Sequence, residues 1–338
     1  IVAWVNIFLG VVYMTALLGS LAWATSALFP DGGLVQAVAT LAEQRPEMLS
    51  TPGPTGSYTP VVLGGTFVVG ILAFSWPHVA IGCMTARDKN LFKWFPLLIF
   101  VFGGLFFYII PFIWGSVVAP AAMPLAELEA LAAENGVALQ TEADRVVQTV
   151  ITDTLPGWFG VFVLLGVIAA AVSTAAVQLM TSSVIVSRDV IQGLFLPEAR
   201  DEQITRWARL AVIGIVVASL IVSLIYQGAM ALYLTDVSVP GFAQWAPALV
   251  GGLLWKRGTK QGAIAATLAG VIYLVASLLI TVGGERILVV GHPVIASLLV
   301  NTLVYIVVSL ATPKPDEEIE TIFFEEVDAY LSAEAGRG

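Results

Sequence analysis

The chain has 338 residues, of which 58% are apolar and only 12% are charged, about half the charged share of an ordinary soluble domain. A water-soluble surface needs charge whatever the size of the core, so this composition predicts an integral membrane protein whose outer surface faces lipid. The formal net charge of −9, from 15 basic and 24 acidic residues, argues against nucleic acid as a partner, because phosphate binding needs clustered basic residues.

Sequence signatures of an enzyme are missing. One cysteine excludes an intrachain disulfide. There is no spacing typical of a zinc or iron–sulfur site, no phosphate-binding glycine loop and no complete dinucleotide-binding fingerprint. An enzyme of the membrane interior would need paired aspartates, a metal motif or a nucleophile–base pair, and none is visible. We therefore expect a protein that is not an enzyme and has no cofactor.

Eight segments are apolar and long enough to cross a bilayer, which takes about 20 residues of α-helix. Each segment is bounded by charged residues or by a stretch rich in proline and glycine. The sequence thus predicts an all-α multi-pass membrane protein, with transmembrane helices over residues 3–28, 61–84, 94–117, 158–186, 206–227, 237–255, 260–282 and 291–311.

Basic residues are distributed unevenly between the two sets of loops. The loops on one side of the membrane, together with the C-terminal tail, form the first set and hold most of the basic residues: Arg87, Lys89, Lys93, Arg188, Arg200, Arg206, Arg209, Lys256, Arg257, Lys260, Lys314 and Arg337. The loops on the other side hold only Arg45, Arg145 and Arg286. Because Lys and Arg accumulate in cytoplasmic loops, the first set is predicted to face the cytoplasm, and the C-terminus with it. The two long loops, 29–60 and 118–157, are then expected outside.

The second segment is interrupted by the sequence Phe74-Ser75-Trp76-Pro77-His78. A proline inside a span removes a backbone hydrogen bond and frees carbonyl groups. Transporters bind their substrates at such breaks near mid-membrane, although a plain kink would give the same sequence. On the first interpretation Phe74, Ser75 and Trp76 contact a solute. For His78 we expect a hydrogen-bonded side chain in a packed interior and not a proton relay.

The fourth segment contains a run of small residues, Gly166–Ala176, with two adjacent hydroxyls at Ser173 and Thr174. Small residues allow helices to pack closely, and hydroxyls inside a helix commonly bond to a carbonyl three or four residues earlier. A sodium site is the other interpretation, because sodium prefers neutral or anionic oxygens. No Asp, Glu, Lys or Arg lies well inside any expected span, so neutral polar groups would have to bind the ion.

The sixth segment contains Pro240, Gly241 and Pro247 within eight residues, which predicts a second unwound helix. Gln244 lies between the prolines, and a buried amide needs hydrogen-bond partners. Contact with a solute and bonding between helices are both compatible with this position.

These stretches, taken in order, resemble the sodium:solute symporter family, which includes symporters for proline, pantothenate, monocarboxylates and glucose. The resemblance covers nearly the whole chain. It is carried by Trp76-Pro77-His78 followed by Arg87, by Ala169 to Thr174 followed by Gln178-Leu179 and Ser182-Ser183, by Pro247 through Trp255-Lys256-Arg257 to Gly262-Ala263, and by His292-Pro293 through Ser309-Leu310 to Thr312-Pro313.

The resemblance implies a fold of two inverted repeats of five helices each, with flanking helices. On this basis the chain is the C-terminal portion of such a protein, and five earlier helices are missing from it. The implied parts are the last helix of repeat one (1–28), an extracytoplasmic loop (29–60), repeat two (61–255) with its outer loop (118–157), two flanking transmembrane helices (256–311) and a cytoplasmic tail (312–338).

The resemblance also implies the sites and the function. Sodium, the coupling ion, would be bound by the carbonyl of Ala170 and by Ser173 and Thr174, with further ligands from a helix absent here. Phe74, Ser75, Trp76 and Gln244 would bind the solute, which we expect to be a small organic anion such as a monocarboxylate or pantothenate.

Several alternatives to this function stay open. The residues from Ala73 to Trp76 differ from those of the proline carriers, and this argues against proline itself. Another amino acid, a sugar or another osmolyte remains an alternative solute. A symporter-like sensor domain of a signalling protein is a different class of function, and the short tail 312–338 favours the carrier. The expected location is the cell membrane.

Overall fold

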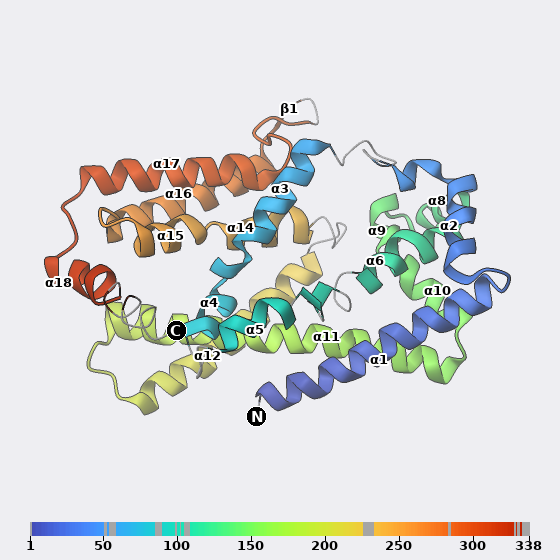
Figure 1. The fold of residues 1–338 in the computed structure, drawn as a ribbon, viewed down its shortest axis with the longest axis horizontal. Coiled ribbons are helices and arrows are strands. Elements are labelled where there is room, and N and C mark those ends of the chain that lie inside the picture. The colour runs from blue at the N-terminus through green and yellow to red at the C-terminus, as the bar shows by residue number, and fades with distance from the viewer. Residues whose placement is uncertain are drawn as a thin grey trace. The chain divides into compact units, whose positions relative to one another are not determined.

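The computed structural model describes residues 2–50, 53, 59–84, 90–98, 100–101, 103–104, 109–225, 233–282, 285–327, 329 and 332. Within these residues the chain is mostly helical, and its only sheet is the hairpin of β1 (Thr281–Val282) and β2 (Glu285–Arg286). The chain forms two compact units, one of residues 1–56 and 81–230 and the other of residues 57–80 and 231–338. The ribbon is coloured along the chain from blue to red (Figure 1).

Seven helices of the described residues are long and apolar enough to cross a membrane, and each overlaps one of the eight expected spans. They cover Trp4–Leu28, Pro60–Met84, Gly157–Phe195, Asp201–Ile225, Leu234–Leu254, Lys260–Leu279 and Pro293–Ala311. An all-α multi-pass membrane protein is therefore confirmed.

The remaining expected span, 94–117, lies partly outside the described residues. Its described parts are α5 (Asn90–Leu98), α6 (Ile110–Ile113) and the π-helix η4 (Trp114–Val118). The helical residues Ile110–Ala122 and the next helix, Leu125–Asn135, are together long and apolar enough to cross a membrane, with a bend of 91° between them. If this bent pair counts as one span, it is the eighth.

The first unit is built around α1 (Val2–Leu28) and α11 (Gly157–Val184), which pack against each other. The helices approach closely where α11 has a glycine: a Cβ added to Gly166 would lie 2.6 Å from the Cβ of Ala16. Small residues at a helix contact allow such an approach inside a membrane. The helix α12 (Asp201–Ile225) follows after the π-helix η5 (Ile185–Phe195), and it begins with acidic residues that complement the helix dipole.

The two long loops fold into short helices of the first unit. The loop after α1 contains α2 (Gly33–Gln44) and η1 (Pro46–Leu49), and the second loop contains α7 (Ala119–Ala122), α8 (Leu125–Asn135), α9 (Leu139–Ala143) and α10 (Val146–Thr154). The buried core of this part includes Leu41, Trp114 and Val150. The indole Nε1 of Trp114 donates to the hydroxyl of Ser20 on α1 (3.2 Å), so the polar edge of this ring is paired.

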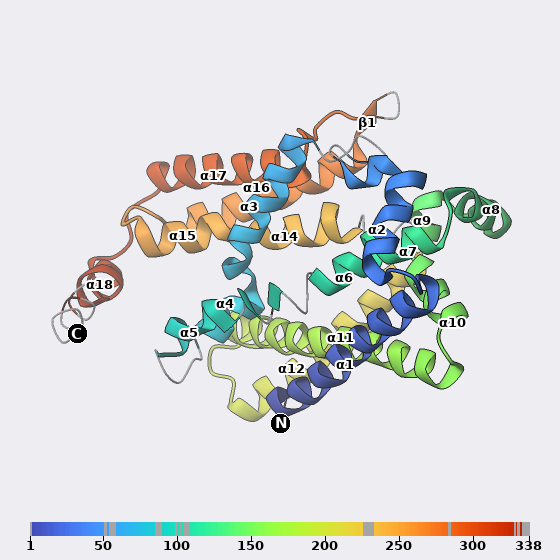
Figure 2. The same ribbon diagram turned by 45° about the vertical axis from the view of Figure 1, so that its right-hand side comes forward.

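The second unit contains a tightly packed antiparallel pair, α16 (Lys260–Leu279) and α17 (Pro293–Ala311), which run side by side in both views (Figures 1 and 2). Glycines of α16 face the polar side chains of α17: Gly262 lies against Ser309 and Gly270 against Asn301. Both helices are capped at their N-termini by a side chain, since Thr259 accepts from the Gly262 amide and His292 Nδ1 accepts from the Val294 amide.

The other helices of the second unit are short pieces separated by breaks. The first series is α3 (Pro60–Ile71), the 3-10 helix η2 (Leu72–Ser75) and α4 (Pro77–Met84), whose last residues belong to the first unit. The second series is the π-helix η6 (Leu234–Ser238), α14 (Val239–Ala243) and α15 (Ala246–Leu254). Beyond α17 come the short helices α18 (Glu317–Glu320) and η7 (Thr321–Glu326).

Candidate functional site

The break predicted at Pro77 is present. Helix α3 ends at Ile71, one turn of 3-10 helix follows, and Trp76 adopts extended backbone angles (φ −62°, ψ 132°) before α4 begins. A residue that precedes proline is pushed out of the helical region by the proline ring, which explains why the helix stops here.

The three residues predicted to bind solute at this break point in different directions. Phe74 is 44% exposed, whereas Ser75 is buried, and its hydroxyl donates to the Leu72 carbonyl (2.6 Å). The ring of Trp76 packs against Phe242, with the ring centres 5.6 Å apart, and against His78 at 5.8 Å. Its indole Nε1 is buried and has no hydrogen-bond partner within the described residues. Trp76 therefore carries a hydrogen-bond donor that is not used.

The second predicted break is also present, between α14 and α15. Two residues in a turn, Gln244 and Trp245, separate the two helices, and Pro247 follows. Phe242 of α14 contacts both Trp76 and His78, so the two breaks of the second unit lie next to each other. The buried residues Val69 and Ala243, one from each series, belong to the same apolar cluster.

Gln244 is fully buried at this second break, and its side chain bonds to α14 and α17. Its Nε2 donates to the Pro240 carbonyl (3.0 Å) and to the Ser297 hydroxyl (3.1 Å). Asn301 Nδ2 donates to its Oε1 (3.0 Å) and to its backbone carbonyl (2.9 Å). The sequence allowed two roles for Gln244, bonding between helices and contact with a solute, and these hydrogen bonds correspond to the first. A solute that contacts the Gln244 side chain has to compete with them.

Ser297 and Asn301 were not singled out from the sequence. The signal that could have found them is a polar stripe inside the last apolar span, since Ser297, Asn301, Tyr305 and Ser309 recur every fourth residue and so share one helix face. All four are buried.

The residues predicted to bind sodium lie on α11, which is continuous through this region. The Thr174 hydroxyl donates to the Ala170 carbonyl, with 3.2 Å between the two oxygens. The hydroxyl of Ser173 makes no hydrogen bond within the described part of the chain. Ala170 and Ser173 are half-buried and Thr174 is exposed. These three residues belong to the first unit, and the predicted solute residues up to Trp76, together with Gln244, belong to the second.

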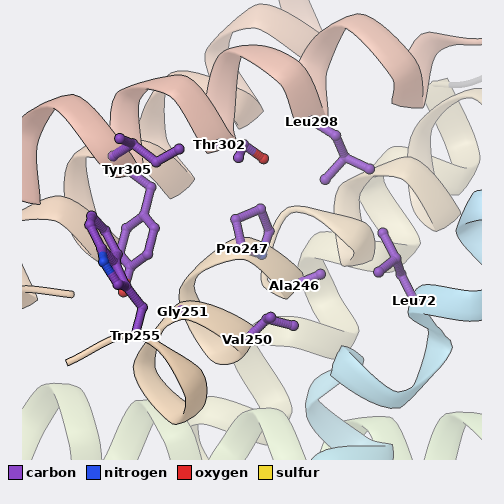
Figure 3. Close-up of a pocket in the computed structure, with 10 residues that line it drawn as sticks. Leu72, Ala246, Pro247, Val250, Gly251, Trp255, Leu298, Thr302 and Tyr305 are labelled. Carbon is purple, nitrogen blue, oxygen red and sulfur yellow. The ribbon is translucent and has the colours of Figure 1, made fainter. Parts of the chain in front are cut away.

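A cavity of about 480 Å³ lies in the second unit, lined mainly by apolar side chains (Figure 3). Trp255 and Tyr305 meet edge to face at one end, and Leu72 lies at the other. Neither Trp76 nor Gln244 lines it, so it is separate from the solute residues predicted here. The lining residues are Leu72, Ala246, Pro247, Val250, Gly251, Trp255, Leu298, Thr302, Tyr305 and Ile306.

Comparison with known proteins gives the family that this chain resembles. The model of the sodium:solute symporter family matches residues 1–270. The sodium/proline symporter of Haemophilus influenzae is 28% identical over 178 residues, which are 52% of this chain and 35% of the relative. The sodium/pantothenate symporter of Escherichia coli is 26% identical over 302 residues, 87% of this chain and 57% of the relative. The osmoregulated proline transporter of Bacillus subtilis is 28% identical over 163 residues, 48% of this chain and 32% of the relative.

The chain spans between about a third and somewhat more than half of the length of these relatives. The matched family and the relatives are transporters and not enzymes.

Proposed function

This chain belongs to the sodium:solute symporter family, and we propose that it forms part of a membrane carrier that couples sodium entry to the uptake of a small organic solute by alternating access. The observation that carries the proposal is the group of three neutral oxygens on α11, from Ala170, Ser173 and Thr174. Two of them are already adjacent, and the third has no hydrogen bond within the described residues.

The spacing of these oxygens fits a monovalent cation of sodium's size. Oxygen ligands lie about 2.3–2.6 Å from calcium, which has nearly the radius of sodium, so two ligands at right angles around such an ion are about 3.3–3.7 Å apart. The Ala170 carbonyl oxygen and Thr174 Oγ1 are separated by 3.2 Å, just below this range, so a small outward movement of the hydroxyl would bring both oxygens to the required spacing. Both oxygens keep lone pairs that can face an approaching ion.

Ser173 can join this pair only if the ion lies close against the helix. Adjacent residues on an α-helix point about 100° apart, so the hydroxyls of Ser173 and Thr174 converge only near the helix surface. The neighbours Ala170 and Ala171 have small side chains that leave room for this approach. The remaining ligands would come from other helices of the carrier.

For the solute we favour a small organic anion, such as a monocarboxylate or pantothenate. The unpaired indole Nε1 of Trp76, beside a helix break, is a donor suited to a carboxylate oxygen. Phe74, with 44% of its surface exposed, offers an apolar contact beside it. Ser75 and Gln244 complete the proposed solute residues, and for both the solute would replace a hydrogen bond within the chain.

The same proposal includes the arrangement of the chain in the cell membrane. Residues 1–28 would end the first repeat, 61–255 would form the second and inverted one, and 256–311 would flank it. The loop 29–60 would face outward, and the C-terminal tail would face the cytoplasm, as the distribution of basic residues predicts. Helix breaks near the bilayer midplane are the feature that inverted-repeat carriers use for binding.

The direct test is uptake of labelled solutes by the full-length protein in proteoliposomes, with an inward sodium gradient or with potassium in its place. The panel should contain a monocarboxylate, pantothenate, proline and a sugar. We expect accumulation of an organic anion that requires sodium. Equal uptake of every panel member with and without sodium would refute the proposed coupling.

A further inference from the structure

The break between α14 and α15 leaves backbone carbonyls without their usual donors. In a regular α-helix the Pro240 carbonyl would accept from the amide of residue 244. Here the Gln244 amide donates to Gly241 instead (3.2 Å), three residues back. The Gln244 side chain replaces the lost donor, because its Nε2 lies 3.0 Å from the Pro240 carbonyl. A side-chain amide thus completes the backbone bonding on the N-terminal side of the break.

A second carboxamide completes the bonding at the break itself, and it comes from a distant helix. Asn301 of α17 donates through Nδ2 to the backbone carbonyl of Gln244 (2.9 Å) and to its Oε1 (3.0 Å). One turn earlier on α17, the Ser297 hydroxyl accepts from Gln244 Nε2 (3.1 Å) while donating to the Pro293 carbonyl. Gln244, Ser297 and Asn301 are all fully buried.

The packing around these carboxamides leaves no spare volume. A Cβ on Gly270 of α16 would overlap the Oε1 of Gln244 and would lie 2.8 Å from the Nδ2 of Asn301. The two side chains therefore fit only because residue 270 has none. Three helices, α16, α17 and the broken α14–α15, meet at this point, and the position of the break depends on the other two.

Asn301 has one feature that packing alone does not explain. Its Oδ1 is buried and has no hydrogen-bond partner within the described residues. A buried acceptor without a partner is unfavourable, and an apolar side chain of similar volume would avoid it. The stabilising contribution of Asn301 is therefore the pair of bonds that its Nδ2 donates to Gln244.

We propose that Asn301 is a positioning residue of the transport cycle, whose two donated bonds hold the α14–α15 break unwound and fix it against α17. This inference rests on the proposed function, because the break is taken to be the part of the second repeat that contacts the solute. Asn301 would act on solute binding through Gln244, without touching the solute or the sodium ion.

The informative variant is Asn301→Leu, which removes both donors and keeps the number and the branching of the side-chain heavy atoms. The matched control is Ser309→Ala on the same helix. Ser309 is also fully buried, and its hydroxyl accepts from the Thr259 amide (3.2 Å), two turns away from the break. A loss of α16–α17 packing should affect both variants, whereas loss of the break geometry should affect only the first.

The first measurement does not depend on transport. Amide hydrogen exchange of the purified full-length protein is followed by mass spectrometry in peptides that cover residues 241–250. We expect exchange about tenfold faster in Asn301→Leu than in the wild type, because two buried hydrogen bonds that hold this segment are lost. Exchange in Ser309→Ala should stay within about twofold of the wild type. Unchanged exchange in Asn301→Leu would overturn the inference.

The second measurement connects the break to the cycle. Asn301→Leu should raise the solute KM about tenfold and leave the half-saturating sodium concentration, measured at saturating solute, within about twofold. In a double-mutant cycle with Gln244→Leu the combined effect on KM should be smaller than the sum of the two single effects, because both changes remove the bond between Asn301 Nδ2 and Gln244 Oε1. Faster exchange with an unchanged KM would show that Asn301 is only structural and would overturn its positioning role. Absence of sodium-dependent uptake in the wild type would instead refute the proposed function.

Discussion

Removal of the Thr174 hydroxyl is the sharpest test of the proposed sodium site. In Thr174→Ala a proposed ion ligand is lost, and the oxygen 3.2 Å away, the Ala170 carbonyl, stays in place. In the proposed site of the whole carrier the ion would be shielded from water, and loss of one partner from a buried polar contact costs about 1–3 kcal/mol. The half-saturating sodium concentration for uptake should therefore rise about 5- to 150-fold. The variant Thr174→Ser keeps the hydroxyl and should behave almost like the wild type.

Thr174→Ala should hardly affect folding. This separates a role of the hydroxyl as an ion ligand from a role in the hydrogen bonding of its own helix. The side chain is exposed, and its only described bond is to its own helix. Changes at exposed positions usually alter the free energy of unfolding by about 0.5 kcal/mol or less. If the hydroxyl served only its own helix, sodium dependence would not change.

The assay is a sodium titration of solute uptake by the full-length protein, normalised to the amount of protein in the membrane. The matched control is Thr15→Ala on α1, since Thr15 is also exposed and its hydroxyl also donates to a carbonyl four residues earlier (2.8 Å). This control should leave the sodium titration unchanged. Ser173→Ala should shift it in the same direction as Thr174→Ala. A half-saturating sodium concentration equal to that of the wild type in both Ser173→Ala and Thr174→Ala would refute the assignment.

Four further outcomes are expected. Trp76→Phe, which keeps an aromatic ring and removes the unpaired Nε1, should raise the KM for an anionic solute about tenfold, and an unchanged KM would remove Trp76 from the solute site. Gly262→Ala should lower the free energy of unfolding in detergent by about 1–3 kcal/mol, because the added Cβ would overlap a side chain of α17. The control is Gly214→Ala, where an added Cβ meets no atom within 4 Å. Equal melting temperatures for the two variants would contradict the reasoning. Burial lowers the pKa of His292 below its usual value, although a nearby carboxylate opposes this shift. The unfolded chain therefore binds more protons at His292 than the folded chain does. Stability that is present above about pH 6.5 should decrease as the pH falls towards 5.5. Melting curves recorded at several pH values should show this decrease in the wild type and not in His292→Asn. A cysteine in place of Arg45 should react with an impermeant reagent added outside cells, and labelling only from the cytoplasm would reverse the predicted orientation.

Local chemistry determined much of this protein at the level of the sequence. A shortage of charge and runs of about 20 apolar residues predicted eight spans, and the described residues contain seven helices that match seven of them. Pro77 and Pro247 located both helix breaks, because a proline cannot donate a backbone hydrogen bond to the preceding turn and its ring crowds the chain before it, whatever the rest of the fold. The adjacent oxygens of Ala170 and Thr174 were also accessible from the sequence, since residues four apart on one helix are neighbours.

Only the tertiary structure decided which groups meet across the breaks. Gln244 was recognised as a buried amide in need of partners, but the sequence could not say that they are Ser297 and Asn301, which lie 53 and 57 residues further along the chain. Their approach depends on the packing of α16 against α17, where Gly270 leaves the necessary space. Contacts between residues so far apart are set by the register of whole helices, and a side chain that moves by one position along a helix turns about 100° away from its partner.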